Sequence, residues 1–178
     1  MQAAELTILN WIQQHLRSGV LDVVVPVFTS LANHGEIWIL LALLLMFRKQ
    51  TRLTGLSVGA GLLADYVVCN LSLKPLVGRL RPFVVNPAVE LLIEAPHDAS
   101  FPSGHTAVSF AAVAALKTAG SPLWKPAAVL ATLIALSRLY LYVHWPTDIL
   151  GGVVVGWLCG ALAAKLVRLG AERFQKNK

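Results

Sequence analysis

Long apolar runs separated by short polar stretches make up most of this chain. The runs predict helices over residues 19–33, 36–47, 53–73, 106–116, 122–142 and 149–167. A membrane-crossing helix needs about 20 mainly apolar residues, so five or six crossings would use nearly all of the 178 residues. The pattern therefore predicts an all-α, polytopic membrane protein whose residues 1–178 form one membrane-embedded domain, a bundle of six transmembrane helices.

The first two runs are the least regular of the set. Asp22 and Pro26 interrupt the first run, and the second is short. Asn33, His34 and Gly35 between them favour a turn. We therefore expect two helices here rather than one long helix.

The residues ahead of the first run carry an amphipathic pattern. Leu6, Leu9, Ile12 and Leu16 recur at helical spacing among polar residues. Such a helix is expected to lie in the membrane interface, although a polar start to the first crossing fits the same pattern. No basic segment precedes the apolar stretch and no small-residue cleavage pattern follows it, so we expect no cleaved signal peptide.

The composition supports a membrane protein and argues against a nucleic-acid-binding one. Apolar residues make up 56% of the chain and charged residues 13%, with 15 Lys and Arg against 9 Asp and Glu. The basic residues stand at the ends of the apolar runs, which is typical of membrane topology. Cys69 and Cys159 lie inside apolar runs and are expected to be reduced, so no disulfide framework is predicted.

Charge placement predicts the orientation. With six crossings and both termini in the cytoplasm, the basic residues fall on the inner side, where Lys and Arg are enriched. The exceptions are Lys74, Arg79, Arg81 and Arg138, which fall on the outer side and belong to two of three polar stretches. Because these stretches flank successive helices, the six-crossing arrangement brings all of them to the same, outer face.

Small residues indicate where helices approach closely. Gly152, Gly156 and Gly160 repeat at every fourth position, as do Gly55 and Gly59. This spacing lets helix backbones pack tightly in lipid. A chance occurrence of small residues is the alternative, and it applies more to the shorter pair.

The first polar stretch, KPLVGRLRP, begins at Lys74 and ends at Pro82. One Lys or Arg at a helix end is usually an anchor that reaches the membrane surface. Lys74, Arg79 and Arg81 instead cluster on the face that membrane topology disfavours, and both side-chain types suit phosphoryl oxygens. We interpret them as candidate phosphate ligands.

The second stretch is FPSGH, and it precedes the fourth predicted helix. Pro102 and Ser103 are also common at ordinary helix starts. The free N–H groups of a helix start, together with Gly104, can however hold an oxyanion. Ser103 can donate a hydroxyl hydrogen bond, and His105 beside them is a candidate proton donor.

The third stretch, SRLYLYVHWPTD, holds a histidine followed four residues later by a carboxylate. A lone histidine near an interface is usually structural, but Asp148 can fix the tautomer of His144 so that its other nitrogen presents a lone pair. Such an imidazole can attack phosphorus. Arg138 is available for the phosphoryl group, while Tyr140, Tyr142 and Trp145 are expected to form an interfacial aromatic belt.

A metal site is the main alternative for these residues. His105, His144 and Asp148, with His97 or Asp98, include suitable ligand types. Neighbouring cations would repel a divalent ion, so we predict neither a metal nor another cofactor. Asp65 inside an apolar run is costly in a membrane, and we expect it to hydrogen-bond to another helix.

Together the three stretches resemble the signature of the type 2 phosphatidic acid phosphatase superfamily: Lys, six residues, Arg-Pro; then Pro-Ser-Gly-His; then Ser-Arg, five residues, His, three residues, Asp. The matching positions are Lys74, Arg81 and Pro82, Pro102 to His105, Ser137 and Arg138, His144 and Asp148. The resemblance covers residues 74–148 and has no departure inside the motifs.

The resemblance implies roles for these residues. His144 would be the nucleophile that forms a phosphohistidine, Asp148 would orient it, and His105 would protonate the leaving oxygen. Lys74, Arg81, Ser103, Gly104 and Arg138 would hold the phosphoryl oxygens without a metal. Arg79 lies outside the strict pattern and is expected to give support.

We therefore expect an integral lipid phosphatase of a bacterial cytoplasmic membrane, with its site on the outer face. Undecaprenyl diphosphate is the first substrate expected from the resemblance, with phosphatidylglycerophosphate and phosphatidate as alternatives. A lipid phosphotransferase, or a non-catalytic protein that binds or transports lipid phosphates, would use the same residues. A vanadium haloperoxidase shares the family's anion site but is not expected in so apolar a chain. The partners expected are substrate and membrane lipids, with no nucleic acid; the sequence leaves the oligomeric state open.

Overall fold

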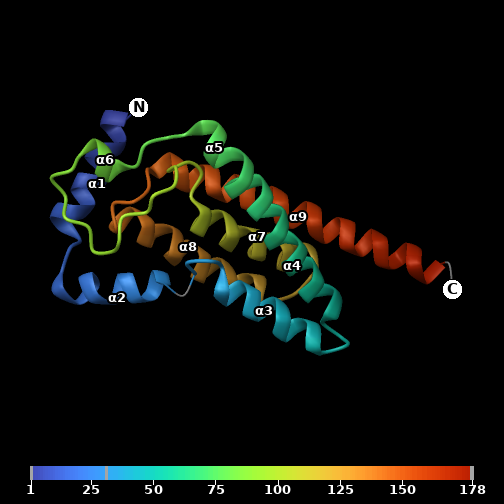
Figure 1. Cartoon of the computed structure of the whole chain (residues 1–178). Coiled ribbons are helices and arrows are strands. Elements are labelled where there is room, and N and C mark those ends of the chain that lie inside the picture. The colour runs from blue at the N-terminus through green and yellow to red at the C-terminus, as the bar shows by residue number, and fades with distance from the viewer. Residues whose placement is uncertain (1, 31, 177–178) are drawn as a thin grey trace.

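The computed structural model describes residues 2–30 and 32–176, and this part of the chain is all-helical, as predicted (Figure 1). The elements are α1 (Gln2–His15), α2 (Gly19–Ser30), α3 (Glu36–Phe47), α4 (Arg52–Asp65), the π-helix η1 (Tyr66–Leu73), α5 (Lys74–Val77), α6 (Pro82–Val85), α7 (Gly104–Thr118), α8 (Trp124–Tyr140) and α9 (Pro146–Lys176).

The apolar runs locate the helices well but not all of their ends. The run 36–47 coincides with α3, and the run 53–73 corresponds to α4 continued by η1. The run 149–167 underestimates α9, which begins at Pro146 and extends to Lys176. Proline is favoured in a first helical turn, and the polar end of α9 can stay helical outside an apolar environment. Leu31, in the predicted run 19–33, lies outside the described residues.

Helices α4, α7 and α9 form the centre of the bundle, with α3 against α4 and α8 against α7 (Figure 1). A Cβ added at Gly156 would lie 2.0 Å from the carbonyl oxygen of Ala107, and one at Gly160 would lie 2.1 Å from that of Ala111. These contacts confirm the predicted close approach of helices along the glycine repeat. Gly55 likewise meets the Ala42 carbonyl, whereas Gly59 has no such neighbour.

The ends of the described chain lie at opposite ends of the bundle (Figure 1). Glu5 of α1 accepts a hydrogen bond from the N–H of Thr147 at the start of α9, and Arg17 donates to the carbonyl oxygen of Glu90. The end of α9 lies far from both (Figure 1). The prediction that both termini and Arg17 share the face opposite the polar stretches is therefore wrong; Lys178 lies outside the described residues.

The cause is the position of α2. Near its start, Asp22 accepts a hydrogen bond from the Tyr140 hydroxyl, and near its end Thr29 accepts one from Arg138. Both partners lie at the C-terminal end of α8, so α2 does not traverse the bundle. An apolar run does not distinguish a crossing helix from one that stays at one end.

Two stretches of the described chain are long and apolar enough to cross a membrane, Arg52–Val85 and Pro146–Lys176. Helices α2 and α3 are apolar but shorter. These lengths do not confirm the predicted count of six crossings.

The predicted aromatic belt is also wrong. Tyr140, Tyr142 and Trp145 are buried in the structure. The Tyr142 hydroxyl donates to Asn10 of α1, and the Trp145 indole N–H donates to the carbonyl oxygen of Leu80. These aromatic side chains attach α1 and the segment before α6 to the bundle, because their polar tips find buried partners.

Candidate active site

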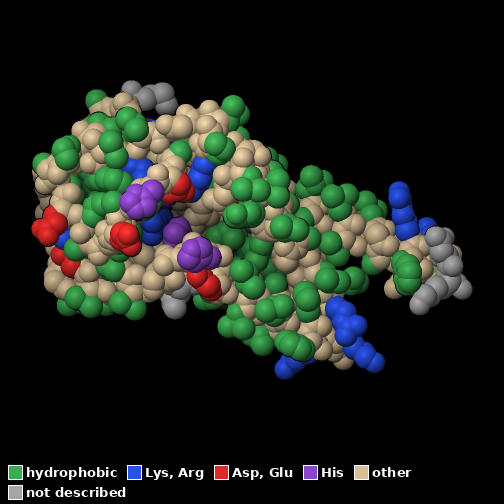
Figure 2. All heavy atoms as spheres, viewed as in Figure 1, with side chains coloured by type: hydrophobic (Ala, Val, Ile, Leu, Met, Phe, Trp, Pro, Cys, Tyr) green, Lys and Arg blue, Asp and Glu red, His purple; other side chains and the backbone are tan. Residues whose placement is uncertain are grey.

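A cavity of about 1040 Å³ opens at the end of the bundle where the polar stretches meet. Figure 2 shows histidine, basic and acidic side chains gathered around a hollow there, while hydrophobic side chains are spread over the rest of this face. The polar lining includes Lys74, Arg81, Asp98, Gly104, His105, Arg138 and His144. Residues far apart in the sequence thus share one cavity.

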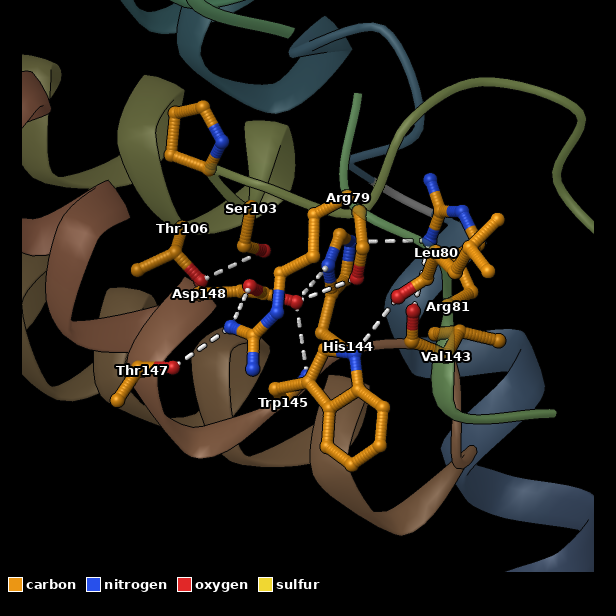
Figure 3. A network of polar contacts seen from close by, with 12 residues as sticks. Arg79, Leu80, Arg81, Ser103, Thr106, Val143, His144, Trp145, Thr147 and Asp148 are labelled. Carbon is orange, nitrogen blue, oxygen red and sulfur yellow. Dashed lines mark hydrogen bonds and ion pairs between the residues drawn. The ribbon is translucent and has the colours of Figure 1, made fainter. Parts of the chain in front are cut away.

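His144 lies in the short connection between α8 and α9, against Asp148. Its Nδ1 is 3.4 Å from Asp148 Oδ2, and that oxygen also accepts a hydrogen bond from the Trp145 N–H at 2.9 Å (Figure 3). The Ser100 hydroxyl donates to the same oxygen. Because α9 begins at Pro146, its first turn carries Asp148 back toward the histidine. Burial lowers the pKa of His144 to about 3, so its imidazole is neutral at physiological pH.

The other nitrogen of His144 faces a cation. Nη1 of Arg81 is 3.3 Å from His144 Nε2 and donates to the carbonyl oxygen of Val143 at 2.8 Å (Figure 3). Arg81 is almost fully buried, and Lys74 is buried as well. The cation and the imidazole nitrogen that does not face Asp148 therefore meet at one place on the cavity wall.

Asp98 binds the same cations, and the sequence had suggested it only as a metal ligand. Its carboxylate accepts from Lys74 Nζ and, at 2.6 Å, from Arg81 Nη2, while its carbonyl oxygen accepts from Arg81 Nε at 2.9 Å. Burial alone would raise the pKa of Asp98, but Lys74 and Arg81 lower it to about 2. An ionised carboxylate thus occupies cations that were predicted to bind phosphate.

Arg138 lines the cavity from the last turn of α8. Its Nη1 donates to Thr29 Oγ1 at 2.9 Å, while its buried Nε has no partner among the described residues. Because a buried donor without a partner is costly, this guanidinium has hydrogen-bonding capacity left for a ligand.

The FPSGH residues take different positions around the start of α7. His105 lines the cavity, with Nε2 3.2 Å from Asn33 Oδ1. A Cβ added at Gly104 would lie 3.3 Å from Asn70 Oδ1 and 3.6 Å from Lys74 Nζ, so glycine leaves room beside the lysine. Ser103 differs from expectation, because its side chain is fully buried, accepts a hydrogen bond from the Thr106 hydroxyl and does not line the cavity (Figure 3).

Arg79 lies behind Asp148 rather than in the cavity lining. Its Nη1 donates to Asp148 Oδ1 at 2.6 Å and to the Thr147 hydroxyl at 2.7 Å (Figure 3). Its Nη2 pairs with Glu5 Oε2 at 2.6 Å, and its guanidinium stacks over Trp145. Nothing in the sequence pattern pointed to Glu5, which appeared as one polar residue of an amphipathic helix.

Asp65 was expected to hydrogen-bond to another helix, and this is wrong for the described residues. Both of its carboxylate oxygens are buried without a partner in that part of the chain, and the residue lines the cavity. No group of three or more His, Cys, Asp or Glu side chains within residues 2–30 and 32–176 is arranged to hold a metal ion.

The fold and the cavity define a helical-bundle protein with cations and histidines at one site, and comparison with known proteins identifies its family. The chain belongs to the PAP2 superfamily, whose family model matches residues 54–170. The resemblance inferred from the polar stretches is thereby confirmed.

Individual relatives agree with this family. Undecaprenyl-diphosphatase of Sulfolobus acidocaldarius is 38% identical over 137 residues, which cover 76% of this chain and 64% of that protein. Undecaprenyl-diphosphatase BcrC of Bacillus subtilis is 33% identical over 149 residues, covering 82% of this chain and 74% of BcrC. The crystal structure of Aquifex aeolicus LpxE has a TM-score of 0.77 at 28% identity and covers 90% of this chain and 94% of that one.

Proposed function

We propose that this protein is an integral membrane lipid phosphatase that hydrolyses a terminal phosphate through a phosphohistidine on His144. The observation that carries the proposal is the setting of His144: Asp148 lies against its Nδ1, and its Nε2 faces the cavity beside Arg81. A neutral imidazole oriented in this way is a nucleophile aimed at an anion site.

The first step would transfer the phosphoryl group to the protein. Lys74, Arg81 and Arg138 bind the phosphoryl oxygens and offset their negative charge, which lowers the barrier to attack by the His144 imidazole. His144 Nε2 forms the N–P bond as the P–O bond to the lipid breaks, and His105 gives its proton to the leaving oxygen. Asp148 stabilises the positive charge that develops on His144.

The second step would release orthophosphate. Water attacks the phosphohistidine as the N–P bond breaks, and His105, now unprotonated, accepts the proton of that water. The step regenerates neutral His144. Cationic side chains supply the charge neutralisation that metal ions supply in other phosphoryl transfers, so we propose a metal-independent reaction.

The cavity continues from the cations to an apolar wall that includes Leu43, Met46, Leu62 and Leu63. A lipid chain fits such a wall, whereas a soluble phosphate ester would gain nothing from it. The relatives named undecaprenyl-diphosphatase make undecaprenyl diphosphate the first candidate. Phosphatidylglycerophosphate and phosphatidate offer the same terminal phosphate and remain alternatives.

We propose that the site faces the outside of a bacterial cytoplasmic membrane. The end of the bundle opposite the cavity carries basic residues, as expected for a cytoplasmic face: Arg48, Lys49, Arg52, Lys117, Lys125 and Arg173. With α1 and α2 at the cavity end, α3, α4 with η1, α7, α8 and α9 are left to cross the membrane. This arrangement replaces six crossings.

The test is orthophosphate release from undecaprenyl diphosphate by the purified full chain in detergent. His144→Ala should lower turnover by about four orders of magnitude, as removal of a catalytic nucleophile does in other enzymes. His15→Ala, which removes an exposed imidazole on α1 that does not line the cavity, is the control and should keep wild-type turnover. Full turnover in His144→Ala would overturn the proposal.

Two further measurements separate the alternatives. Orthophosphate release without any added acceptor would argue against a phosphotransferase. Binding of the lipid by the wild-type protein without any orthophosphate release would support a binding or transport protein. Turnover should persist in excess EDTA; its loss there would restore the metal interpretation.

A further inference from the structure

A chain of polar contacts leads from α1 to the histidine site. Glu5 accepts hydrogen bonds from the N–H of Thr147 at 3.0 Å and from its hydroxyl at 2.6 Å, and it pairs with Arg79 at 2.6 Å. Arg79 reaches Asp148, and Asp148 reaches His144. The N-terminal helix thus reaches the site through a buried carboxylate.

The contacts are well shielded from water. Glu5 is 6% exposed and Asp148 is 0% exposed, so each depends on protein partners for its negative charge. Burial alone would raise the pKa of Glu5, but the hydrogen bonds of Thr147 and the charge of Arg79 lower it, so the carboxylate is ionised. Buried charges persist when they are paired and hydrogen-bonded.

The order of charges matters for Asp148. Arg79 binds Oδ1 of Asp148 on the side away from His144, and an uncompensated guanidinium there would draw the negative charge away from the imidazole (Figure 3). Glu5 on the far side of Arg79 offsets that charge. It also holds the guanidinium in place over Trp145.

We propose that Glu5 is a positioning residue for His144: through Arg79 it fixes the Asp148 carboxylate and keeps its charge available to the imidazole. This inference rests on the proposed function, because it assigns Glu5 a part in activating the phosphatase nucleophile. Glu5 itself does not line the cavity, so it would affect turnover more than substrate binding.

The inference makes a prediction for Glu5→Gln. Glutamine keeps the shape of the side chain but not its negative charge. The positive charge of Arg79 is then no longer offset and acts more strongly on the Asp148 carboxylate, so Asp148 stabilises the imidazolium that forms on His144 less. We expect kcat to fall about ten-fold with KM within about two-fold, because an interaction made only in the transition state is weakened. Steady-state orthophosphate release in detergent measures both constants.

The pH profile separates a charge effect from a structural one. Arg81 and Arg138 set positive charge around His144 and Asp148 sets negative charge, while Lys74, Asp98 and His105 line the same cavity. In the pH profile of kcat/KM, activity is lost at low pH where His144 becomes protonated, and this part of the profile is the acid limb. Glu5→Gln should move the acid limb to lower pH, because the loss of a negative charge lowers the pKa of His144. Arg79→Gln should move it to higher pH, because Asp148 loses a neighbouring positive charge.

Two controls keep the test sharp. Glu172→Gln makes the same chemical change in an exposed ion pair with Arg168 and should match wild type. Asn10→Ala removes the contact that the Tyr142 hydroxyl makes with α1, so it should lower the melting temperature without moving the acid limb.

The outcomes are distinct. The role of Glu5 is overturned if Glu5→Gln, like Asn10→Ala, lowers the melting temperature without moving the acid limb. It is also overturned if Glu5→Gln and Arg79→Gln move the acid limb in the same direction. The proposed phosphatase function stands in either case. If His144→Ala keeps full turnover, the proposed function fails, and the role of Glu5 fails with it.

Discussion

The cations of the site are partly neutralised by a carboxylate that the substrate must displace. Asp98 pairs with Lys74 and Arg81, and its side chain is 51% exposed at the cavity. A phosphate that binds these cations offers the same kind of oxygen in the same place. Asp98 is therefore a competitor for the phosphate on the protein itself.

Replacing Asp98 with asparagine should strengthen anion binding. Removing a competing charge-assisted interaction is worth about 1 kcal/mol, or roughly five-fold in affinity. The inhibition constant of orthovanadate, a phosphate mimic, should fall by about that factor in Asp98→Asn. Because the pKa of Asp98 is about 2, the carboxylate is ionised throughout pH 5–8 and the difference from wild type should not change across that range.

Glu94→Gln is the matched control for Asp98→Asn. Glu94 is an exposed acid in the same cavity-lining segment and has no ion pair within the described residues. The two substitutions remove equal charge, so an equal gain in both would reflect the net charge of the segment. Weaker vanadate inhibition in Asp98→Asn would instead mean that Asp98 helps to hold the cations in place.

At the scale of single residues, the sequence predicted the residues that line the cavity better than those behind it. Lys74, Arg81, His105, Arg138 and His144 could be found because charges and imidazoles beside apolar runs are costly and have a fixed spacing. Glu5 and Asp98 could not, since their partners are distant in sequence and neither stands in a motif. The inward position of Ser103 depends on Thr106, one turn further along α7.

At the scale of elements, the contact between α7 and α9 leaves no room for an added side-chain carbon at Gly156 or Gly160 of α9. Glycines of α9 bring its backbone against carbonyl oxygens of α7, and the added Cβ at Gly156 would lie 2.0 Å from Ala107 O. This contact keeps the start of α9, with Asp148, beside the start of α7, with His105. The glycine repeat made the close approach predictable, although it did not identify the partner helix.

Gly156→Ala should therefore destabilise the protein. Overpacking against backbone costs about 1–3 kcal/mol or more, which corresponds to a melting temperature lower by several degrees for a protein of this size. Thermal unfolding in detergent measures the change. Gly170→Ala in the same helix has open space around the added Cβ, and it should leave the melting temperature unchanged or raise it. Equal melting temperatures for the two variants would contradict the packing argument.

At the scale of the whole molecule, hydropathy predicted a helical bundle but not its path. The apolar run of α2 has the composition of a crossing helix, yet Asp22 and Thr29 bind the end of α8 and keep α2 beside the cavity. Such tertiary hydrogen bonds cannot be read from apolar periodicity. One displaced helix reverses the side on which the N-terminus lies.

This path makes a prediction about labelling in cells. In a Cys69→Ala, Cys159→Ala background, Gln2→Cys and Arg173→Cys each place one thiol on an exposed position at opposite ends of the bundle. If the cavity faces outward, a membrane-impermeant maleimide should label Gln2→Cys on intact cells and Arg173→Cys only after the membrane is permeabilised. Orthophosphate release confirms that each variant is folded. Protection of both thiols on intact cells would return both termini to the cytoplasm, and labelling of Arg173→Cys alone would place the cavity inside.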